Sequence, residues 1–241
     1  MRGVLLGVVL TSLTALPGLA GAVECRDVTY ERETYTLCTV DPASEDLRLF
    51  LADPSSGQPF GSFENVQKAL KAEGKRLDFA MNAGMYHADR SPVGHYVENG
   101  TERSPVISSD GPGNFGLLPN GVFCVTDGAA HVIETRRFLR DPPACRFASQ
   151  SGPMLVIDGA LHPRFLQDSD SRYIRNGVGV SADGAKLWFA MSRAAVNFHT
   201  FGRFFRDGLK ARQALYFDGN ISRLYAPDLG RNDGGFPMGP I

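Results

Sequence analysis

The sequence predicts a single α+β domain built on a mixed, strand-rich sheet with a few helices. Two observations carry this prediction. Asx-Gly pairs recur between apolar or alternating runs of strand length, a pattern typical of hairpin turns. Two segments with helical spacing of apolar residues each precede a short apolar strand. The Asx-Gly pairs are Asn99-Gly100, Asn120-Gly121, Asp127-Gly128, Asp158-Gly159 and Asp183-Gly184.

The N-terminal third contains alternating runs and one helical segment. Residues 28–40 and 47–51 have the apolar alternation of strands. Ser62 can cap a helix with an apolar face at helical spacing, and Gly74 is placed to end it. The short apolar run 77–81 then predicts a strand.

The middle and C-terminal parts predict hairpins and a second helix. The three hairpins pair residues 122–125 with 131–133, 154–157 with 160–161, and 178–181 with 187–191. Thr200 can cap a helix whose aromatic face includes Phe201 and Phe205, and the strand 214–217 follows. Residues 226–241 have little periodicity, which indicates a poorly packed tail or a wrapping loop.

The first 22 residues have the pattern of a signal peptide. Arg2 precedes an apolar run, and Ala20-Gly21-Ala22 is a small-x-small cleavage site. The alternative is a membrane anchor, but Pro17 and Gly18 interrupt the run before the ~20 residues that a span needs. We therefore expect cleavage after Ala22, a mature domain of residues 23–241 with its core at about 77–225, and a periplasmic or extracellular location.

Composition narrows the function classes. The chain has 25 basic and 26 acidic residues, so no basic surplus indicates a nucleic-acid partner. After residue 22 no apolar run is long enough to span a membrane. The P-loop, GxSxG and HExxH motifs are also absent from the sequence.

The four cysteines favour disulfides over a metal site. None forms a CxxC pair, and export would place them in an oxidising compartment. Proximity in the sequence favours Cys25–Cys38 and Cys124–Cys145. Free buried thiols are the alternative.

Four stretches share one design: an apolar strand borders small and polar residues. They are Asn82-Ala83-Gly84, Ser151-Gly152-Pro153, Arg175-Asn176-Gly177 and Asp218-Gly219-Asn220-Ile221-Ser222. Glycine beside polar groups lets the backbone approach a sugar or an anion closely. Each stretch alone is also compatible with an ordinary turn, and Asp218-Gly219 is a strong hairpin signal.

Taken in order, these four stretches resemble the motifs of the phosphodiester glycosidase family. That family has roughly Asn-Gly-Gly-Phe-Phe, Ser-Gly-Pro, Arg-x-x-x-Gly and Leu-Asp-Gly-Gly-Gly-Ser-Ser at the equivalent places. The resemblance implies a hydrolase of sugars linked through a phosphodiester. Ala83, Asn220 and Ile221 occupy positions where the family has glycine. Their side chains narrow the space in which a substrate can approach the backbone, so the resemblance predicts the fold better than it predicts the substrate.

The chemistry of such a substrate assigns roles to two residues. A phosphate monoester leaves the anomeric carbon without needing a proton, so strong general-acid help is less necessary than for ordinary glycosides. A cation for the phosphate and a carboxylate for water or the oxocarbenium-like centre remain necessary. Arg175 fits the first role and Asp218 the second, unless Arg175 is a surface strand arginine and Asp218 a turn former.

The remaining candidates would bind substrate. They are Asn82, Gly84, Ser151, Gly152, Asn176, His199, Gly219, Asn220 and Ser222. His199 could face the site or only a loop, His87 has the context of a loop residue, and His131 and His162 have that of surface hairpins. We expect no cofactor; calcium stays open, although the sequence has no spaced EF-hand ligand run.

Three classes of function fit these features. The first is an exported hydrolase of sugar-phosphate diesters or related glycosides. The second is a non-catalytic module that binds envelope polysaccharide or exopolysaccharide on the same fold, and the substituted glycines keep it open. A structural domain of an exopolysaccharide assembly is a third reading.

Overall fold

The computed structural model describes residues 23–218 and 220–241, so the expected signal peptide and Gly219 lie outside the described residues. Within these ranges the strands form three sheets, and all of their pairings are antiparallel. The α+β class is thus confirmed, with antiparallel sheets in place of one mixed sheet. The reason is that helix α1 (Phe63–Ala72) leads into a different sheet, and helix α3 (Phe198–Arg203) leads into a strand antiparallel to both of its neighbours.

Two large sheets account for most of the strands. The seven-stranded sheet has the order β1 (Glu24–Tyr30), β2 (Glu33–Val40), β12 (Leu187–Ser192), β11 (Asn176–Val180), β13 (Gln213–Tyr216), β9 (Met154–Ile157) and β10 (Ala160–Leu161). The five-stranded sheet has the order β5 (Thr101–Ser104), β4 (Tyr96–Glu98), β8 (Phe147–Ser151), β6 (Gly121–Thr126) and β7 (Ala129–Glu134). A small sheet joins β15 (Arg231–Asn232), β14 (Leu224–Ala226) and β3 (Ala80–Met81).

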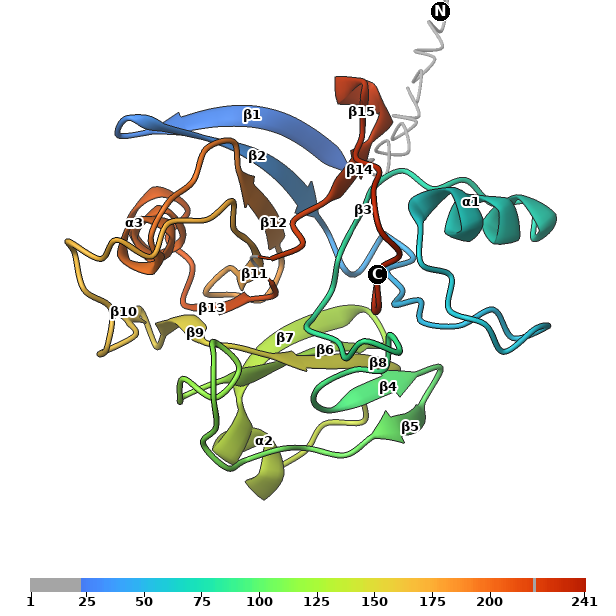
Figure 1. Ribbon diagram of the computed structural model, residues 1–241, viewed down its shortest axis with the longest axis horizontal. Helices are drawn as coiled ribbons and strands as arrows, with labels where there is room; N and C mark the ends of the chain where they lie inside the picture. The colour runs from blue at the N-terminus through green and yellow to red at the C-terminus, as the bar shows by residue number, and fades with distance from the viewer. Residues whose placement is uncertain (1–22, 219) are drawn as a thin grey trace, which may run out of the picture.

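The helices are short and lie at the periphery of the sheets (Figure 1). They are α1 (Phe63–Ala72), α2 (Thr135–Arg140) and α3 (Phe198–Arg203), which continues into the π-helical turn η1 (Phe204–Gly208); η2 (Pro227–Leu229) is a 3₁₀ turn. In Figure 1 the five-stranded sheet forms the lower half of the molecule, and α3 and α1 lie on opposite sides of the upper half.

The main core lies between the two large sheets. Val178, Phe189 and Leu215 from the seven-stranded sheet pack with Phe123 and Phe147 from the five-stranded sheet. A second core fills the space between the other face of the seven-stranded sheet and α3. Burial on both faces explains why β11 and β13 read as nearly continuous apolar runs in the sequence.

The three predicted hairpins are confirmed as β6–β7, β9–β10 and β11–β12. Asp158 and Gly159 both have positive φ, 50° and 83°, as a two-residue type I′ turn requires. Asn120-Gly121 is not such a turn. The Asn120 side chain is buried, donates to the Phe115 carbonyl oxygen at 3.0 Å and accepts from the Thr135 hydroxyl at 2.7 Å.

The predicted helix at Ser62 is confirmed, since the Ser62 hydroxyl accepts from the backbone N–H of Asn65 and α1 follows. The predicted cap of the second helix was wrong by three residues. Asn197, not Thr200, is the N-cap of α3, and its side chain accepts from the Thr200 N–H at 2.9 Å. An asparagine accepts this bond as well as a threonine, so spacing alone did not separate the two positions.

Two other segments differ from the prediction. Residues 47–51 form no ladder with other described residues, because Phe50 exchanges its backbone hydrogen bonds with Ile241 and the Leu51 carbonyl oxygen accepts from Phe60. The short helix α2 was missed, since its sequence Thr-Arg-Arg-Phe-Leu-Arg has only one buried apolar side chain, Phe138. His162, expected on the surface, is 2% exposed.

Both predicted disulfides are present, Cys25–Cys38 and Cys124–Cys145. The C-terminal segment is a wrapping loop rather than a loose tail, because Met238 and Ile241 are buried beside α1. Among the described residues there is no helix whose length and apolar character would suit a membrane span.

Candidate functional site

The four polar stretches meet where several strands end. Asn82 follows β3, Ser151 is the last residue of β8, Asn176 is the first residue of β11, and Asp218 lies two residues after β13. Hydrogen bonds described below link these positions directly or through their chain neighbours. Residues more than 130 positions apart in the sequence thus form one cluster, as four motifs of one site would require.

Asn176 is the centre of this cluster and is fully buried. Its Nδ2 lies 2.9 Å from the Asp218 carbonyl oxygen, 2.9 Å from the Ser222 hydroxyl and 3.2 Å from Asn82 Oδ1. Asn82 Oδ1 also accepts from the backbone N–H of Arg223 at 3.0 Å. These bonds fix the chain from Asp218 to Arg223.

Ser151 and the neighbouring glycines bring the other strands close. The Ser151 hydroxyl donates to the Phe217 carbonyl oxygen at 2.7 Å, directly before Asp218. A Cβ at Gly84 would lie 2.6 Å from the Ser149 hydroxyl, and one at Gly152 would lie 2.6 Å from Asn120 Cβ. A side chain at either position would clash, so both positions require glycine. The sequence predicts that the backbone comes close to another group at these glycines, but it does not identify that group.

Asp218 is half-buried at the end of this arrangement. Its Oδ1 accepts from the backbone N–H of Asn220 at 3.0 Å, and its carbonyl oxygen accepts from the Ser222 hydroxyl at 3.2 Å. The first bond is an Asx turn, so the turn former expected as an alternative is also present. The charge of Asp218 adds to burial in raising the pKa of Tyr86 and of Tyr216.

Arg175 is not a surface strand arginine, because its side chain is 0% exposed. Its Nε donates to the Val196 carbonyl oxygen and its Nη2 to the Ser171 carbonyl oxygen, both at 2.8 Å. Nη1 is buried without a hydrogen-bond partner among the described residues. In residues 23–218 and 220–241 no carboxylate lies within salt-bridge distance of this guanidinium.

Three aromatic rings surround the Arg175 guanidinium. Its Cζ lies 3.6 Å from the Phe198 ring centroid, 5.4 Å from that of Tyr216 and 5.5 Å from that of Tyr173. Burial lowers the pKa of Arg175, and the nearby Tyr216 opposes this. An arginine that stays charged over three ring faces is a fixed positive charge in a poorly solvated place.

Tyr216 connects the charged groups and was not among the expected site residues. Its hydroxyl is buried with no hydrogen-bond partner in the described part of the chain. Burial raises the pKa of Tyr216, Arg175 lowers it, and Asp218 raises it again, so the phenol lies within electrostatic reach of both groups. The signal was present, since Tyr216 lies two residues before Asp218 in the sequence, and side chains two positions apart in an extended chain point to the same side.

Other residues that the sequence predicts for the site are less buried than Asn176. Asn220 is exposed, and His199 is half-buried in the first turn of α3, next to Phe198. Gly219 lies outside the described residues. His87 is exposed in a turn that its backbone N–H closes onto Ser91.

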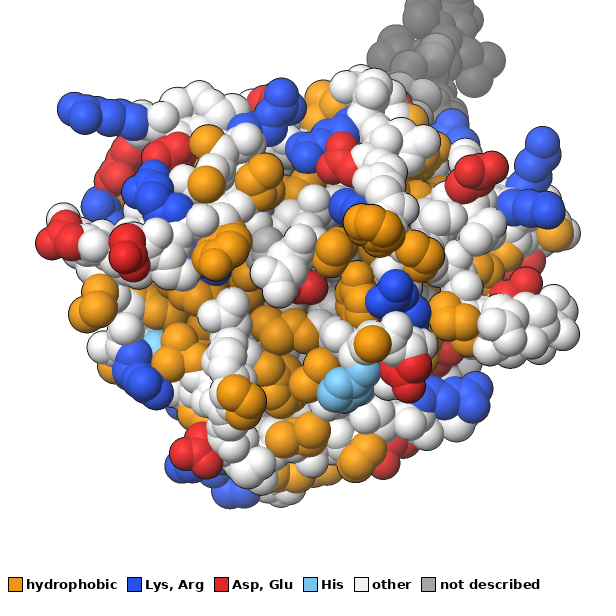
Figure 2. All heavy atoms as spheres, in the orientation of Figure 1, with side chains coloured by type: hydrophobic (Ala, Val, Ile, Leu, Met, Phe, Trp, Pro, Cys, Tyr) orange, Lys and Arg blue, Asp and Glu red, His pale blue; other side chains and the backbone are white. Residues whose placement is uncertain are grey.

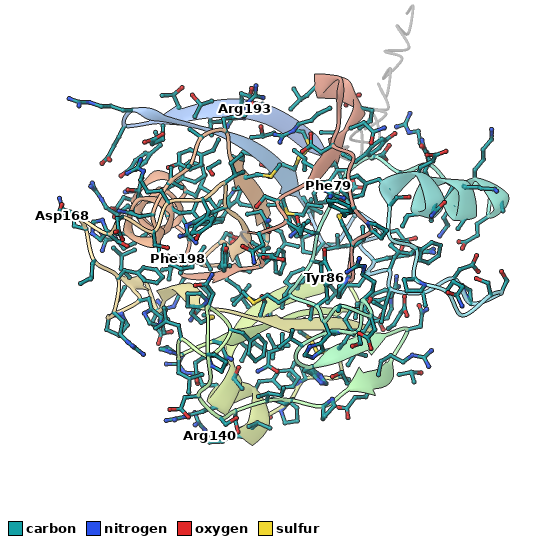
Figure 3. The ribbon with its side chains drawn as sticks, in the orientation of Figure 1. Phe79, Tyr86, Arg140, Asp168, Arg193 and Phe198 are labelled. Carbon is teal, nitrogen blue, oxygen red and sulfur yellow. A yellow bond between two sulfur atoms is a disulfide. The ribbon has the colours of Figure 1, made fainter. Side chains whose placement is uncertain are left out.

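The face of the molecule that Figures 2 and 3 show is hollowed at its middle. Figure 3 shows Phe198 and Tyr86 to the left and right of the centre of the view, and Figure 2 shows hydrophobic side chains across this region. Tyr86 was also missed as a site residue. No group of three or more His, Cys, Asp or Glu residues that could hold a metal ion occurs in the parts of the chain that the structure describes.

Comparison with known proteins agrees with the resemblance of the motifs. A family model for phosphodiester glycosidases matches residues 75–234. The uncharacterized protein YigE of Escherichia coli (strain K12) is 32% identical over 214 residues, which cover 89% of this chain and 83% of YigE.

A solved structure shares the fold. The catalytic domain of zebrafish N-acetylglucosamine-1-phosphodiester alpha-N-acetylglucosaminidase, auto-inhibited by its pro-peptide, aligns with a TM-score of 0.56 and 16% identity. The alignment covers 90% of this chain and 76% of the zebrafish chain. The sequence match and the shared fold together show that the chain belongs to the phosphodiester glycosidase family.

Proposed function

We propose that the protein is an exported hydrolase of sugars linked through a phosphodiester or a related glycosidic bond. The observation that carries the proposal is that a half-buried carboxylate, Asp218, and a buried cation, Arg175, both lie within electrostatic reach of Tyr216, while no carboxylate of the described residues is within salt-bridge distance of Arg175. The charges of these two groups shift the pKa of Tyr216 in opposite directions. A substrate with a cationic transition state at the sugar and an anionic leaving group needs both signs of charge.

Asp218 would act at the anomeric carbon. Ser151 holds the preceding carbonyl oxygen, that of Phe217, and Asn176 and Ser222 hold that of Asp218 itself, so the carboxylate stays in one place during the reaction. It can remove a proton from an attacking water or stabilise the oxocarbenium-like centre. Because the departing phosphate monoester is stable without a proton, a second carboxylate as general acid is not needed.

Arg175 would stabilise the phosphate. Two of its nitrogens are bound to backbone carbonyls and Nη1 is buried, so Arg175 would act on the phosphate through its charge rather than through a direct contact. A fixed charge acts at a distance here, since a poorly solvated site screens it weakly. Asn82, Ser151 and Asn176 hold the backbone of the site, and Asn220, His199 and Ser222 are left as candidates for contacts with sugar hydroxyls.

Export is part of the proposal. Residues 1–22 have the signal-peptide pattern, and both cysteine pairs are bonded, as is typical of proteins that fold outside the reducing cytosol. N-terminal sequencing of the mature protein from the periplasm or the medium should give Val23 as the first residue.

One observation favours a binding module instead. Asn220 and Ile221 replace two family glycines directly after Asp218, and Ile221 packs beside the α1 cluster. Side chains there would narrow the approach of a sugar to the backbone. The module would bind envelope polysaccharide without hydrolysing it.

A panel of substrates separates the two readings. Wild-type protein is incubated with sugar 1-phosphate diesters and with neutral aryl glycosides, and both turnover and binding are measured. Turnover of the diesters, lost in Asp218→Asn, supports the hydrolase. Saturable binding of oligosaccharides without release of any product would favour the module.

A further inference from the structure

A deep apolar hollow lies between the two large sheets and the segments around α1. Its volume is about 450 Å³, within the range of about 300–1,000 Å³ of small-molecule sites. Its walls come from β2, β3, β6 and β12 and from the loops at residues 45–50 and 75–79. Phe79, which Figure 3 labels near β3, is one of the half-buried residues that line it.

The lining changes from apolar inside to charged at the mouth. Every buried residue that lines the hollow is apolar, for example Val40, Leu49, Phe123, Phe189 and Phe217. The charged lining residues are all exposed or half-buried. Among the described residues, no buried side-chain nitrogen or oxygen without a hydrogen-bond partner belongs to this lining. A ligand's buried part would find no new hydrogen bonds and must itself be apolar.

The charges at the mouth already neutralise one another. The charged lining residues are three basic and three acidic: Arg48, Lys75, Arg76, Glu45, Asp46 and Asp78. Asp46 contacts Arg48 at 2.8 Å and Lys75 at 2.7 Å, and Arg76 contacts Asp78 at 2.6 Å. A head group with a net charge would therefore gain little over one without.

We propose that this hollow binds the alkyl chain of a single-chain amphiphile whose head group carries no net charge. The chain would lie on the aromatic and aliphatic floor, and the head would stay in water among the paired charges of the mouth. The site is separate from the Asp218 carboxylate. Asn82, Ser151, Arg175, Asn176 and Asp218 do not line the hollow, although Met81, Ala83 and Phe217, the chain neighbours of Asn82 and Asp218, do.

The direct test is calorimetric titration of the purified protein with n-alkyl phosphocholines of eight to twelve carbons, below their micelle concentrations. We expect 1:1 binding whose Kd falls about fourfold per added methylene, equivalent to ~0.8 kcal/mol. Alkyl maltosides of equal chain length should bind within threefold of the phosphocholines. Alkyl sulfates and alkyl trimethylammonium salts should bind no tighter. Absence of 1:1 binding, or a Kd independent of chain length, would overturn the proposal.

Two charge substitutions locate the site. Leu47→Glu places a carboxylate on the half-buried wall of the hollow and should weaken dodecyl phosphocholine at least tenfold. Leu139→Glu, on the 50% exposed Leu139 of α2, is the matched control and should change nothing. Phe79→Ala is the second probe if Leu47→Glu is unfolded by circular dichroism. Equal losses in the wall and control variants would show that the binding lies elsewhere, whereas Asp218→Asn should bind as wild type.

Discussion

At the residue scale, Asp218 combines two roles that the sequence presented as alternatives. Its Oδ1 closes an Asx turn onto Asn220, and its backbone carbonyl oxygen accepts from Asn176 at the centre of the four family motifs. A turn former and a catalytic carboxylate are compatible, because the turn uses one oxygen and leaves the charge in place. The turn thereby orients the group that the proposed reaction needs.

This compatibility makes Asp218→Asn a sharp test. The amide oxygen can still accept from Asn220, so the turn should survive while the negative charge is lost. We expect turnover to fall by about 10²–10⁴-fold with substrate binding retained. Asp183→Asn, at an exposed Asp-Gly turn, is the matched control and should retain wild-type turnover. Wild-type turnover in Asp218→Asn would return Asp218 to a purely structural role, and Asp89 would be the next carboxylate to test.

Arg175 requires a different prediction, because its guanidinium is structural as well as charged. Arg175→Met keeps much of the bulk but leaves the carbonyl oxygens of Val196 and Ser171 without their donors. We expect unfolding in urea to become easier by about 3 kcal/mol. In protein that remains folded, turnover of phosphodiesters should fall by about 10²–10³-fold.

The exposed neighbour Arg172 supplies the control for that experiment. Among the described residues, its guanidinium contacts Glu33 at 3.5 Å and the Ala195 carbonyl oxygen at 3.3 Å, so Arg172→Met should change stability by less than about 1 kcal/mol. If Arg175→Met lost stability but kept full turnover of phosphodiesters, Arg175 would be a structural residue and the phosphate would need another cation.

At the scale of elements, the hairpins were predictable and the helix starts were less so. Asp158-Gly159 and Asp183-Gly184 specify their turns through local backbone conformation, which the sequence determines directly. The cap of α3 depends on tertiary contacts. Asn197 accepts from Thr200 within the helix, but its amide also donates to the carbonyl oxygens of Gln167 and Ser169, thirty residues earlier. No local pattern contains that second set of partners.

The assignment of the cap can be tested by comparing two substitutions. Asn197→Ala removes one cap bond and the two donors to the 167–169 loop, so we expect a loss of about 2 kcal/mol in the free energy of unfolding. Thr200→Ala should cost less than half of that, because Thr200 contributes its backbone N–H to the cap. Urea unfolding of both variants gives the comparison. Equal losses would mean that the cap bond of Asn197 is not what holds the start of α3.

At the scale of the whole molecule, the sequence predicted the fold class and the convergence of the motifs but not the division into sheets. Each strand's alternation shows which of its residues are buried but not which sheet buries them. Phe123 and Phe189 look alike in the sequence, yet they face each other from different sheets across the main core. The buried positions of His95 and His162 were likewise invisible, because polar residues give no periodic signal of burial.

Those two buried histidines make a prediction about stability and pH. His95 is 4% exposed and His162 is 2% exposed. Burial lowers the pKa of each in the folded protein, against an unfolded value of about 6.5. Below that pH the unfolded chain binds protons that the folded protein does not, so stability must fall as the solution is acidified. The contribution is fully present above about pH 6.5 and is lost between that value and the lowered pKa.

The expected size is up to about 1.4 kcal/mol for each histidine between pH 7.5 and pH 5.5. Glu98, whose pKa burial raises, acts in the opposite direction, so differences between variants are more informative than one stability curve. His95→Asn should keep a donor near the Ser104 carbonyl oxygen, which His95 Nδ1 contacts at 3.0 Å. Its urea-unfolding curve, and that of His162→Asn, should each depend less on pH than wild type, while the exposed control His131→Asn should match wild type. A wild-type pH dependence in both buried variants would mean that these histidines become protonated in the folded protein as readily as in the unfolded chain.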